Sequence, residues 1–512
     1  MPKVKEAKEP PVDKMEKMKI LMVTPEVAPY VKVGGLADIV GSLPKALKES
    51  GHDVRVVCPL YGFLDPSRWK THDRPLIVPM GAQVLYGGVV ETVLPGSEVP
   101  VYFIDHRRFF DRHEVYAGPW GDHADNGERF SFFSRASLEL CRFLNWIPDV
   151  FHCHDWTAGL LPVYLNTTQR STELGACATV MTIHNLKFQG IFQSDLLEFA
   201  GLPREVFRTD GLECMGSLNM MKGGLYHSTK VSTVSPTYAE EIQGPERGEG
   251  LNHVLKFRGG DLVGILNGID TALWDPGIDA ALPANYGLKD LTGKTQCKLA
   301  LQETLNLEVD GGIPVFGLVS RLYDQKGVDL VADIADRALS AMQIQLVILG
   351  SGDPGIEGRL AAAAARHPGR MAVRIGFDDG LARRIYAGSD FFLMPSRFEP
   401  CGLGQMYAMR YGSPPIVRST GGLVDTVDPY VEGLMLGSGF RFELPTADAL
   451  YYAVGWACST FYDRPDELHA LRQNGMAKDF SWGQSARRYG DLYAWAVDAR
   501  KGPPKASSLR RA

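Results

Sequence analysis

The sequence contains no long apolar run. No stretch of about eighteen consecutive apolar residues occurs in it, and a helix that crosses a membrane needs roughly that length. Residues 1–18 mix charges and prolines without an apolar centre, so they lack the pattern of a secretory signal. We therefore expect a cytoplasmic protein without membrane contact, with flexible tails at residues 1–18 and 501–512.

Paired cysteines and a strong excess of one charge are missing as well. The eight cysteines form no CxxC pair, which argues against a disulfide framework and a structural zinc site. The formal net charge is −6 and the basic residues are spread along the chain, so we expect no broad cationic surface for nucleic acid. With 45% hydrophobic and 22% charged residues, the composition is that of an ordinary globular protein.

What the sequence does contain is a regular alternation of strand-like and helix-like segments. Apolar runs such as "DVRVVCP", "ATVMTIH" and "QIQLVILG" recur with helical stretches between them, which predicts parallel sheets covered by helices. At 512 residues the chain is too long for a single core. The alternation restarts after turn residues at 264–277, so we predict two doubly wound α/β domains, at residues 19–263 and 264–479.

Residues just after the predicted strands are the candidates for ligand binding, because open α/β sheets bind ligands beyond the carboxyl ends of their strands. In "YVKVGGLADIV", Lys32, Gly34 and Gly35 stand where a strand gives way to a helix. Free N–H groups and the helix dipole favour an anion there, although a tight turn would use the same glycines. Pro44 lies too deep for the first helical turn, so this helix either begins later or is kinked.

The second half repeats the pattern with charged residues. In "GLVSRLYDQKG", Arg321 and Lys326 follow an apolar strand, and two cations converging at a strand end suit a diphosphate, although a solvated pair remains an alternative. "PSRFEPCGLGQ" places Glu399 after another strand, where a carboxylate can contact a neutral sugar. Glycines follow in the same segment and again, as the pair Gly421-Gly422, after the next strand.

Two other patterns leave different functions open. "LVILGSGDPGIEG" has the GxGxxG spacing of a dinucleotide site, but the acidic residue that should follow, Asp378, comes late, so a sharp turn is the alternative. His152 and His154 in "FHCHDW" point to one face of a strand, yet a zinc site would need a third ligand that the sequence does not identify. His184 and Asn185 end a further strand and are either functional or structural.

Seven motifs in this order resemble bacterial glycogen synthase and plant starch synthase: KxGGL, HDW, HN, LNGID, SRL…QKG, PSRFEPCGL and TGGL. The resemblance runs from about Lys19 to about Trp495. It implies the GT-B architecture, in which two Rossmann-like domains face a deep cleft and a final helix, here residues 480–500, returns to the first domain. The first domain would face the glucan acceptor and the second the nucleotide sugar.

The resemblance also implies an activity and the residues that serve it. The reaction would be retaining transfer of glucose from ADP-glucose to the non-reducing 4-hydroxyl of an α-1,4-glucan such as glycogen, without a metal or another cofactor. Arg321 and Lys326 would hold the donor diphosphate, His184 would lie beside the transferred glucose, and Glu399 would contact its hydroxyls or developing positive charge. The implied substrate-binding residues are Lys32, Gly34, Gly35, Asp38, Asn185, Asn267, Phe377, Cys401, Gly402, Leu403, Thr420, Gly421 and Gly422.

Departures from the family pattern keep the nucleotide open. Phe377 falls where the family commonly has a tyrosine against the base, and Gly404 replaces a frequent threonine. Tyr407 stands where related retaining enzymes of this fold carry a second glutamate, a difference that glycogen and starch synthases share. UDP-glucose therefore remains an alternative donor, and formation of a homo-oligomer stays open. Rival functions are a nicotinamide oxidoreductase, a non-catalytic glucan-binding protein and a phosphorylase, although no accompanying phosphorylase pattern is found.

Overall fold

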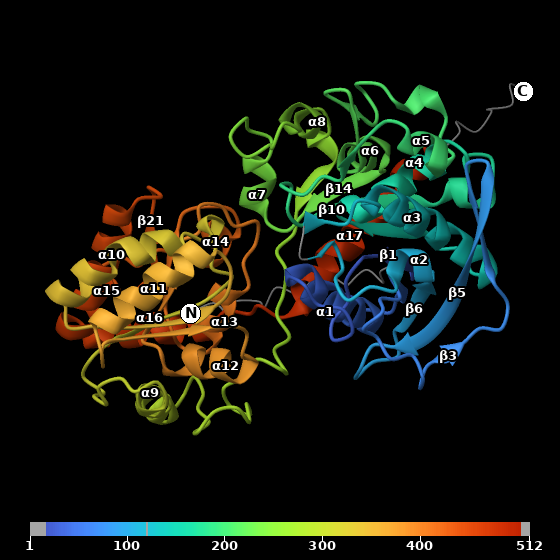
Figure 1. Ribbon diagram of the computed structural model, residues 1–512. Helices are drawn as coiled ribbons and strands as arrows, with labels where there is room; N and C mark the ends of the chain where they lie inside the picture. The colour runs from blue at the N-terminus through green and yellow to red at the C-terminus, as the bar shows by residue number, and fades with distance from the viewer. Residues whose placement is uncertain (1–16, 119–120, 503–512) are drawn as a thin grey trace, which may run out of the picture.

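The computed structural model describes residues 17–118 and 121–502, which form two bodies, each built around its own sheet (Figure 1). The first sheet has ten strands in the order β15-β14-β10-β9-β1-β2-β6-β5-β3, with β4 paired to β5. The pairs from β15 to β6 are parallel, whereas β3, β4 and β5 pair antiparallel. The strands are β1 (Lys19–Val23), β2 (Asp53–Pro59), β3 (Lys70–Thr71), β4 (Leu76–Met80), β5 (Gln83–Val93), β6 (Pro100–Asp105), β9 (Val150–His154), β10 (Ala178–Ile183), β14 (Lys230–Thr233) and β15 (Leu262–Gly264).

The second sheet has six parallel strands in the order β18-β17-β16-β19-β20-β21. They are β16 (Val315–Val319), β17 (Gln345–Gly350), β18 (Met371–Ile375), β19 (Phe391–Met394), β20 (Pro415–Arg418) and β21 (Phe440–Phe442). A strand pair and a small three-stranded sheet lie outside these two sheets: β7 (Ala117–Gly118) with β8 (Gly121–Asp122), and β11 (Ile191–Phe192), β12 (Glu213–Cys214) and β13 (Ser217–Asn219) in the order β11-β13-β12. The predicted α/β class with two mostly parallel sheets is confirmed.

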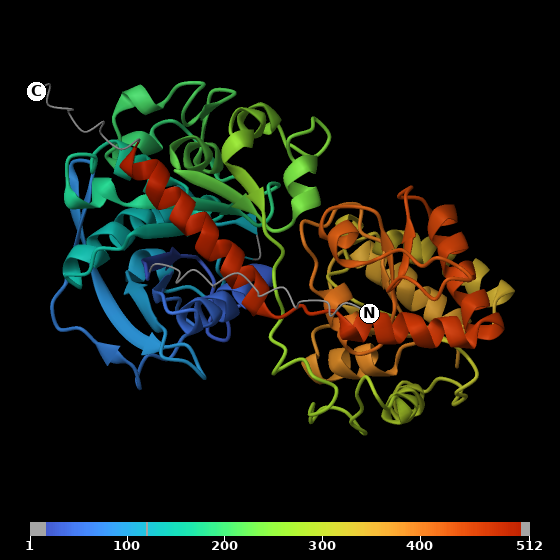
Figure 2. The same cartoon turned by 180° about the vertical axis from the view of Figure 1, so that it is seen from behind.

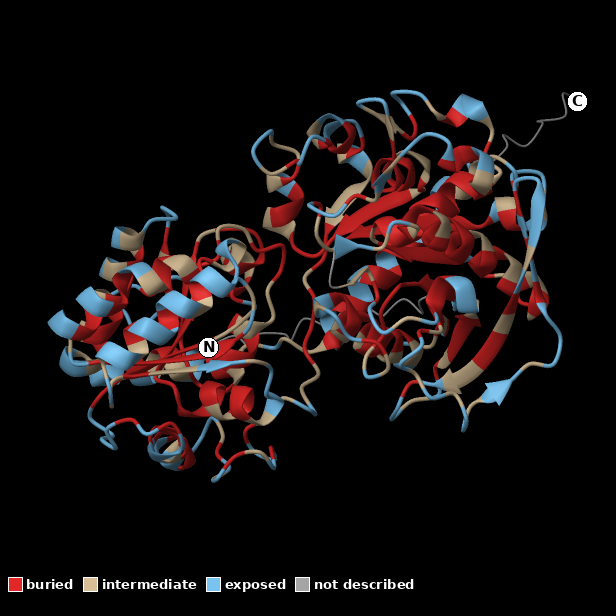
Figure 3. Ribbon diagram, in the orientation of Figure 1, coloured by how far each residue is buried: buried red, intermediate tan, exposed pale blue. Residues whose placement is uncertain are grey.

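Helices cover the faces of both sheets, so the strands are buried and the outer faces of the helices are exposed (Figure 3). In the first body they are α1 (Gly35–Glu49), α2 (Arg107–Phe110), α3 (Asn126–Phe143), α4 (Leu160–Asn166), α5 (Leu196–Ala200), α6 (Met220–His227), α7 (Pro236–Glu241) and α8 (Asn252–Phe257). In the second they are α9 (Thr292–Thr304), α10 (Val328–Ala341), α11 (Pro354–Arg366), α12 (Asp379–Gly388), α13 (Gly404–Arg410), α14 (Gly422–Thr426), α15 (Ala447–Asp463) and α16 (Pro465–Ala477). Within the described residues, no helix is long and apolar enough to span a membrane.

Helix α1 begins directly at Gly35 and continues past Pro44 to Glu49. The alternative of a later start is therefore wrong. Pro44 is itself buried, and the missing backbone N–H costs the helix one hydrogen bond that the apolar face of α1 offsets by packing.

The last helix, α17 (Trp482–Lys501), follows the second body in the chain but lies across the first (Figure 2). It packs against α1, β9 and β10. Its buried positions recur at helical spacing, which gives an amphipathic helix with one inward stripe. They include Ser485, Ala486, Tyr489, Leu492, Tyr493 and Ala496.

Polar contacts join the two bodies where α7 meets α14 (Figure 1). The backbone N–H and the hydroxyl of Thr237 donate to the Asp425 carboxylate, at 2.9 and 2.7 Å. The Ser235 hydroxyl donates to the Pro400 carbonyl at 2.6 Å. These bonds hold α7 against α14, and the loop that follows β14 against the loop that follows β19.

Candidate active site

The loop between β1 and α1 is the first candidate site, and a carboxylate already lies in it. The backbone N–H groups of Val33 and Gly34 donate to Glu26 Oε2 at 2.7 and 2.9 Å, and the Tyr116 hydroxyl donates to Glu26 Oε1 at 2.5 Å. Burial raises the pKa of Glu26, while these donors oppose the increase. The Gly34 N–H is therefore not free for an anion, contrary to the sequence interpretation.

Lys32, Gly35 and Asp38 surround the start of α1. Lys32 Nζ forms a partly exposed ion pair with Asp38 Oδ1 at 2.8 Å. Burial raises the pKa of Asp38, and Lys32 opposes that increase. A Cβ added to Gly35 would lie 4.0 Å from Leu403 Cδ1, so this loop of the first body approaches a loop of the second. The structure thus brings together predicted substrate-binding residues from both bodies.

The centre of the second body's site is the ion pair of Lys326 and Glu399, whose Nζ and Oε2 atoms are 2.5 Å apart. The Ser396 hydroxyl also donates to Glu399 Oε2, at 3.0 Å, and Glu399 is only 5% exposed. Lys326 follows β16 and Glu399 follows β19, and these strands are neighbours in the sheet. Gly327 allows this approach, since it has φ +66° and an added Cβ would lie 2.1 Å from the Pro395 carbonyl oxygen.

Arg321 lies in the same loop after β16, between that strand and Lys326. It is exposed and forms no ion pair with any residue that the structure describes. The GxGxxG segment packs against this loop: Cβ atoms added to Gly350 and Gly352 would lie 1.9 Å from the Ser320 oxygen and 2.5 Å from the Leu322 oxygen. These glycines therefore serve close backbone packing where β17 turns into α11.

The glycine pair after β20 also serves backbone packing. A Cβ added to Gly421 would lie 2.0 Å from the Glu399 carbonyl oxygen, and one added to Gly422 would lie 2.2 Å from that of Cys401. The Gly421 N–H and the Thr420 hydroxyl donate to Glu241 Oε1 of α7, at 2.9 and 3.1 Å. This loop therefore shapes the Glu399 segment and joins it to the first body.

Cys401, Gly402, Leu403 and Asn267 complete this region. Burial raises the pKa of the Cys401 thiol to about 12, although hydrogen bonds from Asn267 oppose the increase. Asn267 Oδ1 is buried and has no hydrogen-bond partner among the described residues. Gly402 has φ +74° and leads through Leu403 into α13. Asn267 thus lies beside the Glu399 segment, where its free amide oxygen can accept a further hydrogen bond.

His184 and Asn185 follow β10 in the first body. His184 Nε2 is hydrogen-bonded to His154 Nδ1 at 2.9 Å, and the His184 backbone N–H donates to Asp155 Oδ1 at 2.8 Å. Burial lowers the pKa of His184 to about 3 and raises the pKa of Asp155 to about 7, the latter opposed by backbone donors of His184 and Asn185. His184 is consequently neutral near pH 7.

Phe377 lies apart from these contacts, after β18, and is 85% exposed. It lines a cavity of about 350 Å³ together with Leu305, Arg374, Asp378 and Arg384. An exposed aromatic ring beside two guanidinium groups is suited to a flat, polar ring system.

Comparisons with known proteins give this site its context. Residues 19–257 match the family model described as starch synthase catalytic domain, and residues 313–452 match that of glycosyl transferases group 1. The chain is 47% identical over 492 residues to glycogen synthase 1 of Geobacter sulfurreducens, covering 95% of this chain and 98% of that protein. It is 48% identical over 485 residues to glycogen synthase of Anaeromyxobacter dehalogenans strain 2CP-1, covering 94% and 100%.

The chain belongs to the glycogen synthase and starch synthase family. Its structure resembles the catalytic domain of starch synthase IV from Arabidopsis thaliana, solved with ADP and acarbose, with a TM-score of 0.87 and 34% identity over 94% of this chain and all of that one. It also shares its fold with sucrose-phosphate synthase from Thermosynechococcus elongatus, with a TM-score of 0.58, 19% identity and coverage of 93% and 98%. This synthase is therefore a glucosyltransferase with the GT-B fold.

In this member of the glycogen synthase family, the sequence did not reveal several contacts that hold the predicted site residues in place. Glu26, Glu241 and His154 each hold a predicted site residue, yet none has a local pattern that reveals its partner. For Glu26, a carboxylate shortly after a strand was a usable signal. For Glu241 no such signal exists, because its partner lies 180 residues away.

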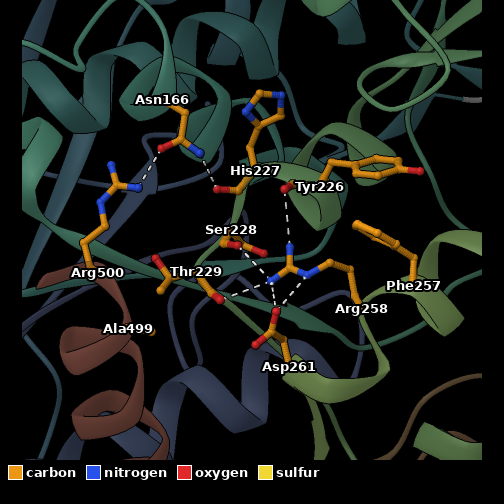
Figure 4. Close-up of a pocket in the computed structure, with 10 residues that line it drawn as sticks. All are labelled: Asn166, Tyr226, His227, Ser228, Thr229, Phe257, Arg258, Asp261, Ala499 and Arg500. Carbon is orange, nitrogen blue, oxygen red and sulfur yellow. Dashed lines mark hydrogen bonds and ion pairs between the residues drawn. The ribbon is translucent and has the colours of Figure 1, made fainter. Parts of the chain in front are cut away.

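A second cavity of this synthase, about 450 Å³, is lined by residues that directly precede β14 and β15, so it lies at the opposite edge of the first sheet from the residues that follow its strands. Figure 4 shows the residues that line it. Its lining includes Asn166, Tyr226, Phe257, Arg258, Asp261 and Arg500. The guanidinium groups are already engaged: Arg258 donates to the carbonyls of Leu225, Ser228 and Thr229, and Arg500 donates to Asn166 and the Gly175 carbonyl. Its cations therefore stabilise the ends of backbone segments, and the cavity offers a reference region remote from the candidate active site.

Proposed function

We propose that this protein transfers glucose from ADP-glucose to the non-reducing 4-hydroxyl of an α-1,4-glucan such as glycogen, with retention of anomeric configuration and release of ADP. The reaction needs no metal and no other cofactor. The proposal makes the second body the donor side and the first body the acceptor side.

The ion pair between the partly exposed Lys326 and the buried Glu399 is the observation that carries this proposal. It lies just after neighbouring parallel strands, where open α/β sheets bind their ligands. Arg321 adds an exposed cation in the same loop. Two cations near a strand end suit a diphosphate, and a carboxylate beside them suits the hydroxyls of a sugar.

The chemistry explains why both charges are useful. Breaking the anomeric C–O bond builds an oxocarbenium-like sugar and leaves negative charge on the departing diphosphate. Lys326 and Arg321 stabilise that negative charge, and Glu399 faces the sugar. Since its pKa is about 3, His184 acts near pH 7 as a neutral hydrogen-bonding group and not as a proton donor of the imidazolium type.

The solved starch synthase IV supports ADP-glucose and a glucan as substrates, because that protein was bound to ADP and acarbose at 34% identity to this chain. The proposal is tested by incubating the purified protein with glycogen, a chelator and either ADP-glucose or UDP-glucose. We expect glucose incorporation and release of ADP from ADP-glucose, with the new linkage in the α configuration by NMR. Preference for UDP-glucose would show that the nucleotide of the donor, which the base pocket selects, is assigned wrongly. Activity with neither donor in a folded protein would contradict the proposal as a whole.

Phe377 gives a sharper test of the base pocket. If its exposed ring packs on adenine, Phe377→Ala raises KM for ADP-glucose by about tenfold, since aromatic stacking on a base contributes roughly 1–3 kcal/mol. The matched control is Phe257→Ala, which removes a ring that is 75% exposed in the remote cavity. Equal KM values for both variants in steady-state kinetics would exclude Phe377 from nucleotide binding.

A further inference from the structure

A buried hydrogen-bonded chain connects α17 to the strands that carry His184. The hydroxyl of Tyr493 is 2.8 Å from His152 Nδ1, and His152 Nε2 is 2.6 Å from Thr182 Oγ1. Thr182 Oγ1 is in turn 2.6 Å from Ser232 Oγ. The four side chains are fully buried and come from α17, β9, β10 and β14.

The hydrogen-bond partners of His152 determine which of its two ring nitrogens carries the proton. Burial lowers the pKa of His152 to about 3 and raises that of Tyr493, so both groups are neutral near pH 7. A buried hydroxyl must donate to an acceptor, and His152 Nδ1 is the partner of the Tyr493 hydroxyl. Tyr493 therefore donates to Nδ1, which places the His152 proton on Nε2, where it is donated to Thr182.

His152 in turn packs against His154, the histidine that bonds His184. His152 and His154 are two apart on β9 and so share a face, and their ring centroids are 4.1 Å apart. His154 Nδ1 then bonds His184 Nε2 at 2.9 Å. His154 Nε2 and His184 Nδ1 both lack a partner among the described residues, so one of these two atoms carries an unpaired proton. His154 is fully buried, whereas His184 is partly buried at the candidate site, where a substrate can accept that proton. We therefore place it on His184 Nδ1, and the shared proton on His154 Nδ1, which donates it to His184 Nε2.

We propose that His154 is a positioning residue that fixes the orientation and tautomer of His184 for glucosyl transfer, and that Tyr493 of α17 holds His154 in place through His152. The proposal rests on the glucosyl transfer proposed above. It makes the last helix, which follows the donor-side body in the chain, part of the support for a residue on the acceptor side.

The test compares two substitutions of the same shape. His154→Asn keeps a polar atom where Nδ1 lies, whereas His154→Leu has the same branching without it. Both lose the same ring packing, so a purely structural role predicts equal effects. We expect His154→Leu to lower kcat by about tenfold to hundredfold, as misplacement of a catalytic group does. We expect His154→Asn to recover most of that loss, and ADP affinity by calorimetry to stay unchanged in both.

A second pair of variants tests the link to α17. Tyr493→Phe removes the hydroxyl that bonds His152, and we expect it to lower kcat by a smaller factor than His154→Leu. Tyr489→Phe is the control, because Tyr489 lies one turn earlier on α17 with its ring 5.4 Å from that of His152. Its hydroxyl lies near Thr182 and Ser232 but has no hydrogen bond of good geometry among the described residues. Equal effects of the two tyrosine variants would overturn the link through His152.

A spectroscopic readout separates this inference from the proposed function. Nitrogen NMR of labelled histidine side chains should show a single His184 tautomer, protonated on Nδ1, in the wild type and in His154→Asn. His154→Leu should give a mixture. If the wild type transfers no glucose, the function fails while this signature still decides the positioning role. A mixed His184 tautomer in the wild type, or equal kcat for the two His154 variants, overturns the inference.

Discussion

Replacing Lys326 by methionine lowers kcat by about 10²–10³-fold, the loss typical of removing one preorganised charge from a developing anion. KM for ADP-glucose changes less, because the contact strengthens as the diphosphate leaves. The substitution also leaves Glu399, only 5% exposed, with Ser396 as its remaining side-chain partner. Steady-state kinetics with saturating glycogen measures both parameters.

A double-mutant cycle with Glu399→Gln separates two roles of Lys326, the stabilisation of the diphosphate and the pairing with Glu399. If Lys326 and Glu399 act as a unit on the substrate, the double variant loses little more than either single variant. The control is Arg366→Met, which breaks an exposed ion pair with Asp336 in the same body and should leave kcat unchanged. A Lys326→Met enzyme with unchanged kcat and a raised KM would assign Lys326 to ground-state binding alone.

Much of the fold could be predicted because parallel strands buried on both faces have continuous apolar runs. All six residues of β10 are buried, and its run "ATVMTI" is visible in the sequence. The antiparallel strands β4 and β5 were not predicted. The short run of β4, "LIVPM", contains Pro79, and β5 contains Gly87-Gly88 and mixes exposed, half-buried and buried positions, so neither has the pattern of a buried parallel strand.

The candidate site could be predicted only where the order of the strands determines it. Lys326 and Glu399 follow neighbouring strands, so topology alone places them at one edge of the sheet. The partner of His152 could not be predicted, since Tyr493 is 341 residues away. The glycine pair at Gly421 shows a different limit: close packing on a backbone and close approach to a ligand require the same residue.

Asp155→Asn stabilises the protein near pH 8, and the gain shrinks as the pH falls. Burial raises the pKa of Asp155 from 3.8 to about 7 in the folded state. Between these values the folded chain binds a proton that the unfolded chain has released, so ionisation of Asp155 costs stability as the pH rises. Asparagine resembles the protonated form and still accepts the His184 N–H. The difference in unfolding free energy between variant and wild type should therefore be larger at about pH 8 than at about pH 4 by about 4 kcal/mol.

The opposite sign is expected for Asp261→Asn. Burial alone would raise the pKa of Asp261, but Lys230 and Arg258 lower it, with Lys230 Nζ at 2.6 Å from Asp261 Oδ1. The stability that this carboxylate contributes is present above its unfolded pKa and is lost as the pH falls through the folded value. Asp261→Asn should thus destabilise at neutral pH and lose that effect in acid. Urea unfolding of both variants between about pH 2 and pH 8 measures the two slopes, that of Asp155 between about pH 4 and pH 8 and that of Asp261 below about pH 4. A slope of the same sign in both variants would show that a change common to asparagine substitutions, and not the burial of Asp155, governs the pH dependence.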